Sequence, residues 1–369
     1  MNITPKYELS VIIPAINEVE ALPALITALG RQQGVRFEVI IADGGSHDET
    51  PALCHAVANT VNVPFQCIAT PAGRAKQMNA GALHAHASDL LFLHADTTIN
   101  DPMLLANARD SMQQASSITG DGKIAGHFPL RFVRSSDDHD GAYYFYEAKT
   151  TLNRRDCING DQGFWLSKRY LQQLGGFDES LDYMEDARLA NKIFDSGRWI
   201  TLPGKVGTSA RRFESEGLKQ RQTLNALLCN FEHIGLHRFF DAARAAYRQQ
   251  GQAETLDLGP FLIIIHRLSV AEGFRRRLRY WLDTGSYVAE NAWQLAFQKD
   301  CRRNREAGAA PGDGEQYSLK FYDQCIAPLI TSLPARVTTA MLTAIWFYRL
   351  LIMTQLTKKT SNSANAARQ

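Results

Sequence analysis

The residues of this chain that are best suited to chemistry follow short apolar segments. His94 and Asp96 come directly after the apolar residues 90–93. Four consecutive large apolar residues predict a strand that is buried on both faces. Ligands in open α/β sheets collect at the carboxyl ends of the strands, so these two side chains would lie where a metal ion or a nucleotide binds. Asp is also common at strand ends because it favours turns, and this pattern alone leaves both interpretations open.

Two adjacent acids, Glu185 and Asp186, stand at the predicted start of a helix that runs to residue 194. Acids at this place complement the positive end of the helix dipole, which requires no function. The same place could hold a general base for a reaction at a hydroxyl group. Arg211 and Arg212 follow a short predicted strand, and a surface loop is the simplest interpretation of this pair taken alone.

Alternating strands and helices would position these side chains. We expect strands at residues 9–14, 37–42, 65–69 and 90–93, and helices at 21–29, 51–58 and 102–112. This alternation predicts a parallel sheet in a nucleotide-binding α/β domain. Asp43 and two glycines follow the second strand, where the backbone can approach a ligand closely. Arg74 and Lys76 open an alanine-rich helix, a natural contact for a diphosphate, although the P-loop pattern is absent.

The remainder of the chain predicts further elements with less regular order. Residues 126–132 alternate like an exposed edge strand, 143–153 predict a helix, and 158–167 predict a turn and a strand. The acidic residues 137–140 favour a solvated loop over a cation site. We expect helices at 239–249, 258–268, 272–282 and 287–299, and a mobile loop or linker at 304–316. The basic and aromatic residues 274–281 favour a solvated helix face.

Composition excludes several classes of protein. The chain has 369 residues and a net charge of +2, so nothing global indicates nucleic-acid binding. Six scattered cysteines predict neither a zinc site nor a disulfide framework, and we expect reduced, buried thiols. The first residues lack a basic and apolar signal peptide, which indicates a cytoplasmic protein. Residues 337–356 are apolar, but Arg349, four threonines and a glutamine favour a packed or membrane-interfacial helix over a spanning one.

Six motifs occur in one order along the chain, and together they resemble glycosyltransferase family 2. They are Pro14-x-x-Asn17-Glu18, Asp43-Gly44-Gly45-Ser46-x-Asp48-x-Thr50, Gly73-Arg74-Ala75-Lys76-Gln77-Met78-Asn79-Ala80-Gly81, Leu93-His94-Ala95-Asp96-Thr97, Gly160-Asp161-Gln162-Gly163 and Met184-Glu185-Asp186. The fourth motif is similar to that of small bacterial members. The resemblance covers residues 8–235 and implies a GT-A fold, with a Rossmann-like, mainly parallel sheet flanked by helices. We expect this catalytic domain at 1–235 and an α-helical C-terminal extension at 236–369.

The resemblance also implies a role for each matching residue. Asp186, or Glu185 in second place, would be the general base of an inverting transfer to an acceptor hydroxyl. Asp96, the last residue of the family's Asp-x-Asp motif, would bind Mn²⁺ or Mg²⁺. His94 replaces the first Asp of that motif and could be a metal ligand, a ribose contact or a packing residue. Asp161, Gln162, Arg211 and Arg212 would face the diphosphate or the acceptor. Donor and nucleotide contacts would come from Pro14, Ala15, Asn17, Glu18, Asp43, Gly45, Arg74, Gln77, Asn79, His94 and Ala95.

The expected partners are therefore a nucleotide-diphosphate sugar and an unknown acceptor that could be lipid-linked, with peripheral membrane contact through the C-terminal helices on the inner face of the cell membrane. Two other functions stay open. A nucleotidyltransferase acting on a sugar phosphate would carry a glycine-rich basic signature after the first strand, where this chain has residues 14–18. A nucleotide-sugar binding protein without catalysis is conceivable because of His94, but Asp96 and Asp186 together argue against it.

Overall fold

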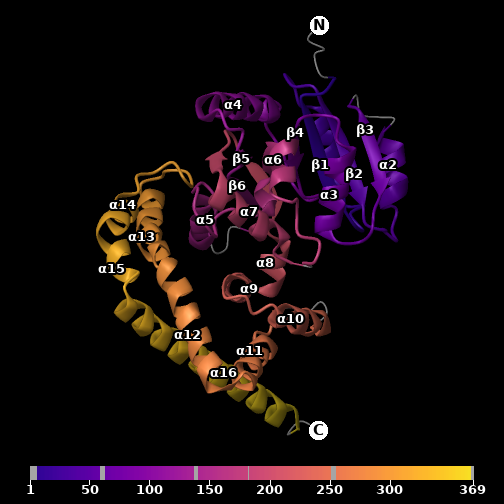
Figure 1. Ribbon diagram of the computed structural model, residues 1–369. Coiled ribbons are helices and arrows are strands. Elements are labelled where there is room, and N and C mark those ends of the chain that lie inside the picture. Colours follow the sequence, from indigo (N-terminus) through magenta and orange to yellow (C-terminus); the bar gives the residue numbers. More distant parts are fainter. Residues whose placement is uncertain (1–5, 59–62, 137–139, 182, 251–254, 367–369) are drawn as a thin grey trace. The chain divides into compact units, whose positions relative to one another are not determined.

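The computed structural model describes all of the chain except residues 1–5, 59–62, 137–139, 182, 251–254 and 367–369. Most of the predicted acidic loop at 137–140 therefore lies outside the described residues. The chain divides into two compact units, Met1–Ala210 and Arg211–Gln369 (Figure 1). Residues 211–235, which we expected in the catalytic domain, fall in the second unit, and each unit is described by itself.

The first unit is built on a seven-stranded, mainly parallel sheet. Its strand order is β3-β2-β1-β4-β7-β5-β8, in which β7 is antiparallel to both of its neighbours. The four predicted strands all form: β1 (Leu9–Ala15), β2 (Phe37–Asp43), β3 (Phe65–Ala69) and β4 (Asp89–Phe92). The others are β5 (Ile124–His127), β7 (Phe164–Ser167) and β8 (Arg198–Thr201), while β6 (Leu130–Val133) pairs with β9 (Val206–Ser209) in a separate ribbon.

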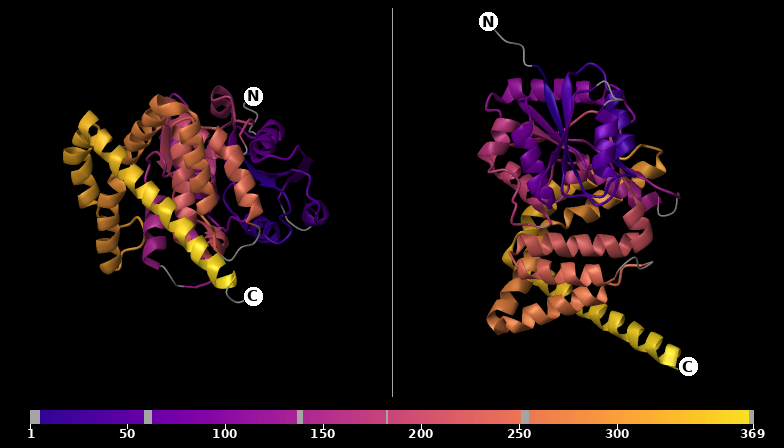
Figure 2. Two further views of the ribbon diagram at one scale, coloured as in Figure 1. Left: turned by 90° about the horizontal axis from the view of Figure 1, so that it is seen from below. Right: turned by 90° about the vertical axis from the view of Figure 1, so that its right-hand side faces the viewer.

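Helices cover both faces of this sheet, as Figure 2 shows on the right. The helical elements of the first unit are α1 (Leu22–Gly30), α2 (Thr50–Ala58), α3 (Arg74–His84), α4 (Leu104–Thr119), α5 (Asp140–Lys149), η1 (Gly160–Gln162), α6 (Lys168–Gln173) and α7 (Glu185–Ser196). Along β1, Leu9, Val11 and Ile13 join the core cluster with α1 and α4, while Ile12 faces α3 on the other side. A strand buried on both faces needs the unbroken apolar run that predicted it.

The chain crosses the sheet between β3 and β4, and this crossing positions the candidate site. β2 and β3 lie on one side of β1 and β4 lies on the other, so the strand order reverses between β1 and β4. Crevices at such a reversal are where open α/β sheets bind ligands. α3 makes the crossing and packs closely on β1, because a Cβ at Gly81 would lie 2.4 Å from Ile12 Cγ2.

The prediction of an exposed edge strand at 126–132 was wrong. β5 is fully buried and lies between β7 and β8, and only β6 alternates between buried and exposed residues. A buried His127 inside β5 imitated the polar position of an edge strand. All six cysteines are free, as expected, but only Cys54, Cys157 and Cys301 are buried. The expectation of buried thiols was wrong for the half-buried Cys67 and Cys229 and for the exposed Cys325.

The second unit is helical. It contains α8 (Arg211–Glu216), α9 (Leu218–His233), α10 (Arg238–Gln249), α11 (Gly259–Ala271), α12 (Gly273–Glu290), α13 (Trp293–Glu306), α14 (Tyr317–Phe321), the π-turn η2 (Tyr322–Ile326), α15 (Ala327–Ile330) and α16 (Leu333–Ala366). The predicted break between residues 282 and 287 was wrong, because α12 continues to Glu290. Its Gly285 allows the close approach of Ala340 on α16. The predicted loop at 304–316 is shorter than expected, and Arg303 and Asn304 both donate to the Glu315 carbonyl.

α16 contains a segment, Leu333–Gln355, that is long and apolar enough to cross a membrane by length and composition alone. Only 17% of that segment is buried in the unit. Its buried side chains, such as Phe347 and Leu351, pack on α11 and α12, while most of its apolar side chains are exposed.

Candidate active site

Gln77 holds the ends of β1 and β2 together beneath the crevice. The side chain is buried, and its Nε2 donates to the carbonyls of Ala15 and Ala42, each at 2.8 Å. Gly44 leaves the space for this amide, since a Cβ there would lie 3.0 Å from Gln77 Nε2. Both donors of the amide nitrogen are therefore committed to the backbone.

The loops after β1 and β2 are joined by side-chain hydrogen bonds. The carboxylate of Asp43 accepts from the backbone N–H of Gly45 at 3.2 Å and from Ser46 Oγ at 2.5 Å. Asn17 has a positive φ of 56°, its N–H donates to Ser46 Oγ, and its Oδ1 accepts from the N–H of His47, both at 2.8 Å. These contacts fix the two loops to each other. Pro14, Ala15 and Glu18 precede or belong to the loop after β1, and the predicted contacts of these residues with a nucleotide stay predictions.

Beyond β4, three segments that are distant in sequence meet at Gly160. His94 Nδ1 lies 2.7 Å from an oxygen of Asp161, and the backbone N–H of Gly160 donates to Asp186 Oδ2 at 2.6 Å. A Cβ at Gly160 would lie 2.8 Å from His94 Nε2 and 3.1 Å from Asp186 Oδ2. The absence of a side chain at this position is what lets an imidazole and two carboxylates gather around one backbone segment.

The first turn of α7 delivers the two acids in different directions. Met184 precedes them with φ of 66°, an uncommon left-handed conformation for a non-glycine residue, and such strain often marks functional sites. Glu185 is only 2% exposed and pairs with Arg74 Nη1 at 3.4 Å. Asp186 is half-buried, and its Oδ1 also accepts from the N–H of Ala187 at 2.8 Å.

The charged side chains of this cluster shift the pKa values of their neighbours. Burial and the neighbouring charge of Asp186 raise the pKa of Glu185, and the charge of Arg74 opposes them. Burial would lower the pKa of Arg74, but the carboxylates of Glu185, Asp186 and Asp161 outweigh it and leave that pKa raised. About half of the Arg74 side chain is exposed, so its guanidinium can still meet a ligand while it stays charged.

A buried polar network supports η1 from behind. Gln162 is fully buried, its Oε1 accepts from the N–H of Asn159 at 2.9 Å, and its Nε2 donates to the Thr150 carbonyl at 3.0 Å. These two contacts fix the orientation of the amide, so Nε2 also donates to His127 Nδ1 at 2.9 Å. His127 Nε2–H must then donate to Asn153 Oδ1 at 2.8 Å. The imidazole is therefore the neutral tautomer with its proton on Nε2.

Asp96 is the residue predicted to bind a metal ion. It is half-buried in a turn two residues after His94, follows the buried Ala95, and its carboxylate has no hydrogen bond or ion pair within the described part of the chain. The described residues contain no group of three or more His, Cys, Asp or Glu side chains that could hold a metal ion by themselves. One available carboxylate fits the kind of Mg²⁺ site in which substrate phosphates and water supply the other ligands.

Asn79 braces a turn next to α3. Its Nδ2 donates to the Phe177 carbonyl at 2.9 Å, and its Oδ1 accepts from the Phe177 N–H at 3.0 Å. Gly176, with φ of 72°, leaves room for this side chain. The amide is therefore engaged with the turn before α7.

The structure brings together five of the residues proposed from sequence: Arg74, His94, Asp161, Glu185 and Asp186. Gln77, Asn79 and Gln162 are engaged in internal hydrogen bonds, and their predicted contacts with a donor or acceptor stay predictions. Arg211 and Arg212 begin α8 in the second unit, so their predicted contact with a diphosphate also stays a prediction. The supporting role of His127 was missed, because the sequence analysis placed it in an edge strand. Met184 was included in the sixth motif, but its left-handed conformation was not predicted.

Comparisons with known proteins identify a family that part of this chain resembles. Residues 10–175 match the family model described as glycosyl transferase family 2. The chain is 36% identical over 100 residues to a PGL/p-HBAD biosynthesis glycosyltransferase of Mycobacterium bovis, covering 26% of this chain and 38% of that protein. It is 35% identical over 95 residues to a 4,4'-diaponeurosporenoate glycosyltransferase of Staphylococcus haemolyticus, covering 25% of each. The chain thus spans less than two fifths of these curated relatives.

Among solved structures, the chain resembles a mannosyltransferase from Pyrobaculum calidifontis in complex with GDP-Man and Mn²⁺. The TM-score is 0.48 at 19% identity, over 94% of this chain and 90% of that one. The narrower resemblance carried by residues 93–97 stays a prediction. The predicted fold class, a mainly parallel sheet flanked by helices with a helical C-terminal region, is confirmed. Residues 10–175 of this chain belong to glycosyl transferase family 2.

Proposed function

We propose that the first unit transfers a sugar from a nucleotide-diphosphate donor to an acceptor hydroxyl, with inversion at the anomeric carbon. The observation that carries this proposal is the convergence of Arg74, His94, Asp161 and Asp186 around Gly160. A cation, an imidazole and two carboxylates at the carboxyl end of β4 combine a site for phosphate charge with a site for proton removal. The match of residues 10–175 to the family supports the same chemistry and not a nucleotidyltransferase.

Asp186 is the general base in this proposal. It accepts one hydrogen bond on each oxygen, and a carboxylate has about four lone-pair sites, so lone pairs remain for an acceptor hydroxyl. It takes the hydroxyl proton as that oxygen bonds to the anomeric carbon, while the bond to the diphosphate oxygen breaks on the opposite side. Glu185 is less suited to this role because it is buried and already pairs with Arg74.

Arg74 faces the diphosphate in this proposal. Its guanidinium can contact two phosphate oxygens at once, and Glu185 orients it from the buried side. Asp161 and Gln162 lie at the same end of the site, and Asp161 keeps the imidazole of His94 in place. Arg211 and Arg212 are proposed as additional contacts for the diphosphate or the acceptor.

A divalent cation, Mn²⁺ or Mg²⁺, would be held by Asp96 together with diphosphate oxygens and water. When bound, such a cation stabilises the charge that grows on the leaving diphosphate. The nucleotide itself would lie against the loops after β1 and β2, where Asp43 has acceptor oxygens for a base N–H. Asn17, Gly45 and the neighbouring residues of these loops would form its wall.

Substitution of Asp186, the proposed general base, tests this function. A panel of UDP- and GDP-sugars is first screened by thermal shift with Mn²⁺, since a bound donor raises the melting temperature. For the donor class found, Asp186→Asn should lower transfer by a factor of about 10² to 10⁴, the usual contribution of a general base. Its affinity for the nucleoside diphosphate, titrated with Mn²⁺ and again with a chelator, should match that of the wild type, and the chelator should weaken both.

The matched control is Asp195→Asn, near the other end of the same helix, where the side chain is exposed and pairs with Arg155. This control should keep both transfer and binding. Near-normal turnover by Asp186→Asn would remove Asp186 from the role of base. A wild type that binds nucleotide but neither hydrolyses nor transfers from any donor would identify a binding protein instead.

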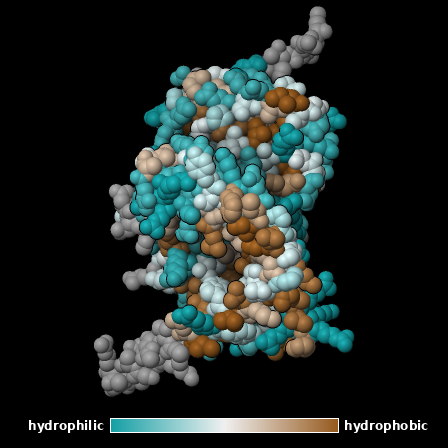
Figure 3. Space-filling model, turned by 90° about the vertical axis from the view of Figure 1, so that its left-hand side faces the viewer, coloured by the Kyte–Doolittle hydropathy of each residue, from teal (hydrophilic) through white to brown (hydrophobic). Residues whose placement is uncertain are grey.

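Membrane attachment through the second unit is part of the proposal. Six exposed apolar residues line one side of α16 and are called here the α16 apolar face: Met341, Leu342, Ile345, Trp346, Ile352 and Met353. The face shown in Figure 3 carries a gathering of apolar residues in its lower half. Exposed apolar faces of helices bind membrane interfaces, and the exposed Arg349 among these residues favours an interfacial position of the helix over a spanning one. We also propose a location on the cytoplasmic surface of the cell membrane. Sedimentation with vesicles tests the attachment to lipid.

A further inference from the structure

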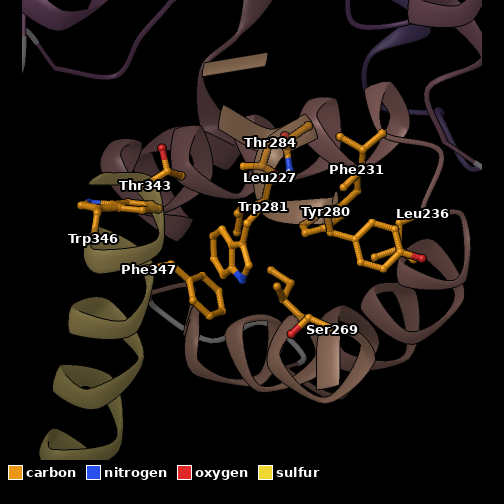
Figure 4. A pocket seen from close by; sticks show the side chains of 13 residues that line it. Leu227, Phe231, Leu236, Ser269, Tyr280, Trp281, Thr284, Thr343, Trp346 and Phe347 are labelled. Carbon is orange, nitrogen blue, oxygen red and sulfur yellow. Dashed lines mark hydrogen bonds between the residues drawn. The ribbon is translucent and has the colours of Figure 1, made fainter. Parts of the chain in front are cut away.

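The second unit contains a pocket between α9, α11, α12 and α16 (Figure 4). Its cavity volume is about 50 Å³, and one side opens to solvent. This volume is smaller than the about 300 to 1,000 Å³ of pockets that enclose a whole small ligand, so only the end of a narrow chain would fit inside it. The lining residues are Leu227, Asn230, Phe231, Ile234, Leu236, Ile265, Ser269, Tyr280, Trp281, Thr284, Thr343, Trp346 and Phe347.

The wall of this pocket is suited to an aliphatic ligand. Figure 4 shows Trp281 and Phe347 next to each other, and their ring centroids are 5.4 Å apart at an angle of 64°. No Lys, Arg, Asp or Glu is among the lining residues. A wall of aromatic and aliphatic side chains gains free energy from excluding water, about 25 cal/mol for each Å² of apolar surface that a ligand covers.

One buried polar group in the wall lacks a partner. Asn230 is 6% exposed, and its Nδ2 donates to Thr284 Oγ1 at 3.2 Å. Its Oδ1 is buried and has no hydrogen-bond partner within the described residues. An unsatisfied buried acceptor is costly, so a ligand that donates to it binds with an added advantage. A hydroxyl group suits this position in either orientation of the amide, because it both donates and accepts.

The pocket continues into an exposed apolar surface. Trp346 lines the pocket and also belongs to the α16 apolar face, where 48% of its surface is exposed. Thr343, one turn earlier, lines the pocket beside it. A ligand that arrives on this face can therefore enter the pocket without leaving apolar surroundings, which favours a molecule supplied by a membrane over one dissolved in water.

We infer that this pocket binds the single aliphatic chain of a membrane lipid alcohol, whose hydroxyl is hydrogen-bonded to Asn230. This site lies wholly in the second unit and outside the family match, so it does not depend on sugar transfer by the first unit.

The experiment uses the full chain without donor and 1-decanol as the probe. Isothermal titration should give saturable binding of 1-decanol, and decyl methyl ether, which cannot donate a hydrogen bond, should bind about tenfold more weakly. Thr343→Trp fills the pocket and should abolish binding. Thr338→Trp, at an exposed position of the same helix, is the matched control and should bind as the wild type. Absence of saturable binding to the wild type, or equal binding to Thr343→Trp, would overturn the inference.

Asn230→Leu tests the polar contact separately. This variant should bind 1-decanol and the ether equally, because the acceptor that distinguishes them is gone. Asn230→Leu removes the unsatisfied oxygen but also the hydrogen bond to Thr284 Oγ1, and these two effects on stability oppose each other. The melting temperature of the empty protein should therefore change little, and measuring it detects a folding defect. A tenfold preference for the alcohol in this variant would show that the hydroxyl binds elsewhere and would refute the role of Asn230.

Discussion

The buried His127 predicts that the first unit loses stability in mildly acidic solution. Burial lowers the pKa of this imidazole from 6.5 to about 4, although contacts with Asn153 and the backbone oppose the effect. The hydrogen bonds of His127 also predict a lowered pKa, independently of burial. Gln162 Nε2 donates to His127 Nδ1, so a proton on Nδ1 would place two donors against each other.

The sign and the size of this change in the free energy of unfolding follow from the linkage between proton binding and folding. Between pH 6.5 and about 4, the unfolded chain binds a proton at this residue that the folded chain does not, so stability falls as the pH falls. The difference between the two pKa values, at about 1.4 kcal/mol for each pH unit, corresponds to about 3 kcal/mol in total. Between pH 8 and pH 5 the free energy of unfolding should fall by about 2 kcal/mol. This is a large part of the about 5 to 15 kcal/mol that is usual for the free energy of unfolding of a protein.

The assay is urea unfolding at pH 8, 6 and 5, followed by pulsed hydrogen exchange on peptides from β5 and β7. These peptides report on the first unit alone. His127→Gln should lower the free energy of unfolding at pH 8 but should remove about 2 kcal/mol of its dependence on pH. His84→Gln, at an exposed end of α3, is the matched control and should keep the wild-type dependence. An unchanged dependence on pH in His127→Gln would refute the tautomer and the buried neutral state.

Two further predictions concern the site and the membrane. Gly160→Ala would place a Cβ 2.8 Å from His94 Nε2 and 3.1 Å from Asp186 Oδ2. Sugar transfer should therefore fall at least about tenfold, while the free energy of unfolding in urea should change by less than about 1 kcal/mol. Retained activity would show that the His94 and Asp186 side chains can move without loss of function. Full-length protein should sediment with anionic phospholipid vesicles, and Ile345→Asp should weaken this at least about tenfold, whereas Leu295→Asp on α13 should not; equal sedimentation of both variants would exclude the α16 apolar face as the contact.

Much of the first unit could be predicted because its strands are buried on both faces. Continuous apolar runs at β1, β2 and β4, each followed by polar residues, are visible in one dimension. β5 could not be recognised in this way, because His127 and Gly126 interrupt its apolar pattern. His127 is tolerated there only through Gln162 and Asn153, which are distant in sequence. Gly126 is needed because a Cβ would lie 2.7 Å from Leu202.

The predicted boundary within α12 was wrong for a similar reason. The predicted helices at 272–282 and 287–299 leave Gly285 in a turn between them, and glycine does lower helix propensity by about 1 kcal/mol relative to alanine. In the structure it lies within α12, where a Cβ would be 2.6 Å from Ala340 of α16. The packing of two helices at this glycine outweighs the local cost. Such packing depends on both helices, so it cannot be predicted from the sequence of either helix alone.

The candidate site also contains a balance of charge that no single motif reveals. Arg74 faces Glu185, Asp161 and Asp186, while Asp96 carries a further carboxylate. One positive charge against several negative ones would repel a diphosphate, and two like charges about 4 Å apart cost about 4 kcal/mol at an effective dielectric constant of 20. A raised pKa of Glu185 reduces this repulsion without removing it. Under the proposed function, a donor that arrives with its own divalent cation would meet less repulsion here, and Asp96 is the carboxylate proposed to hold that cation.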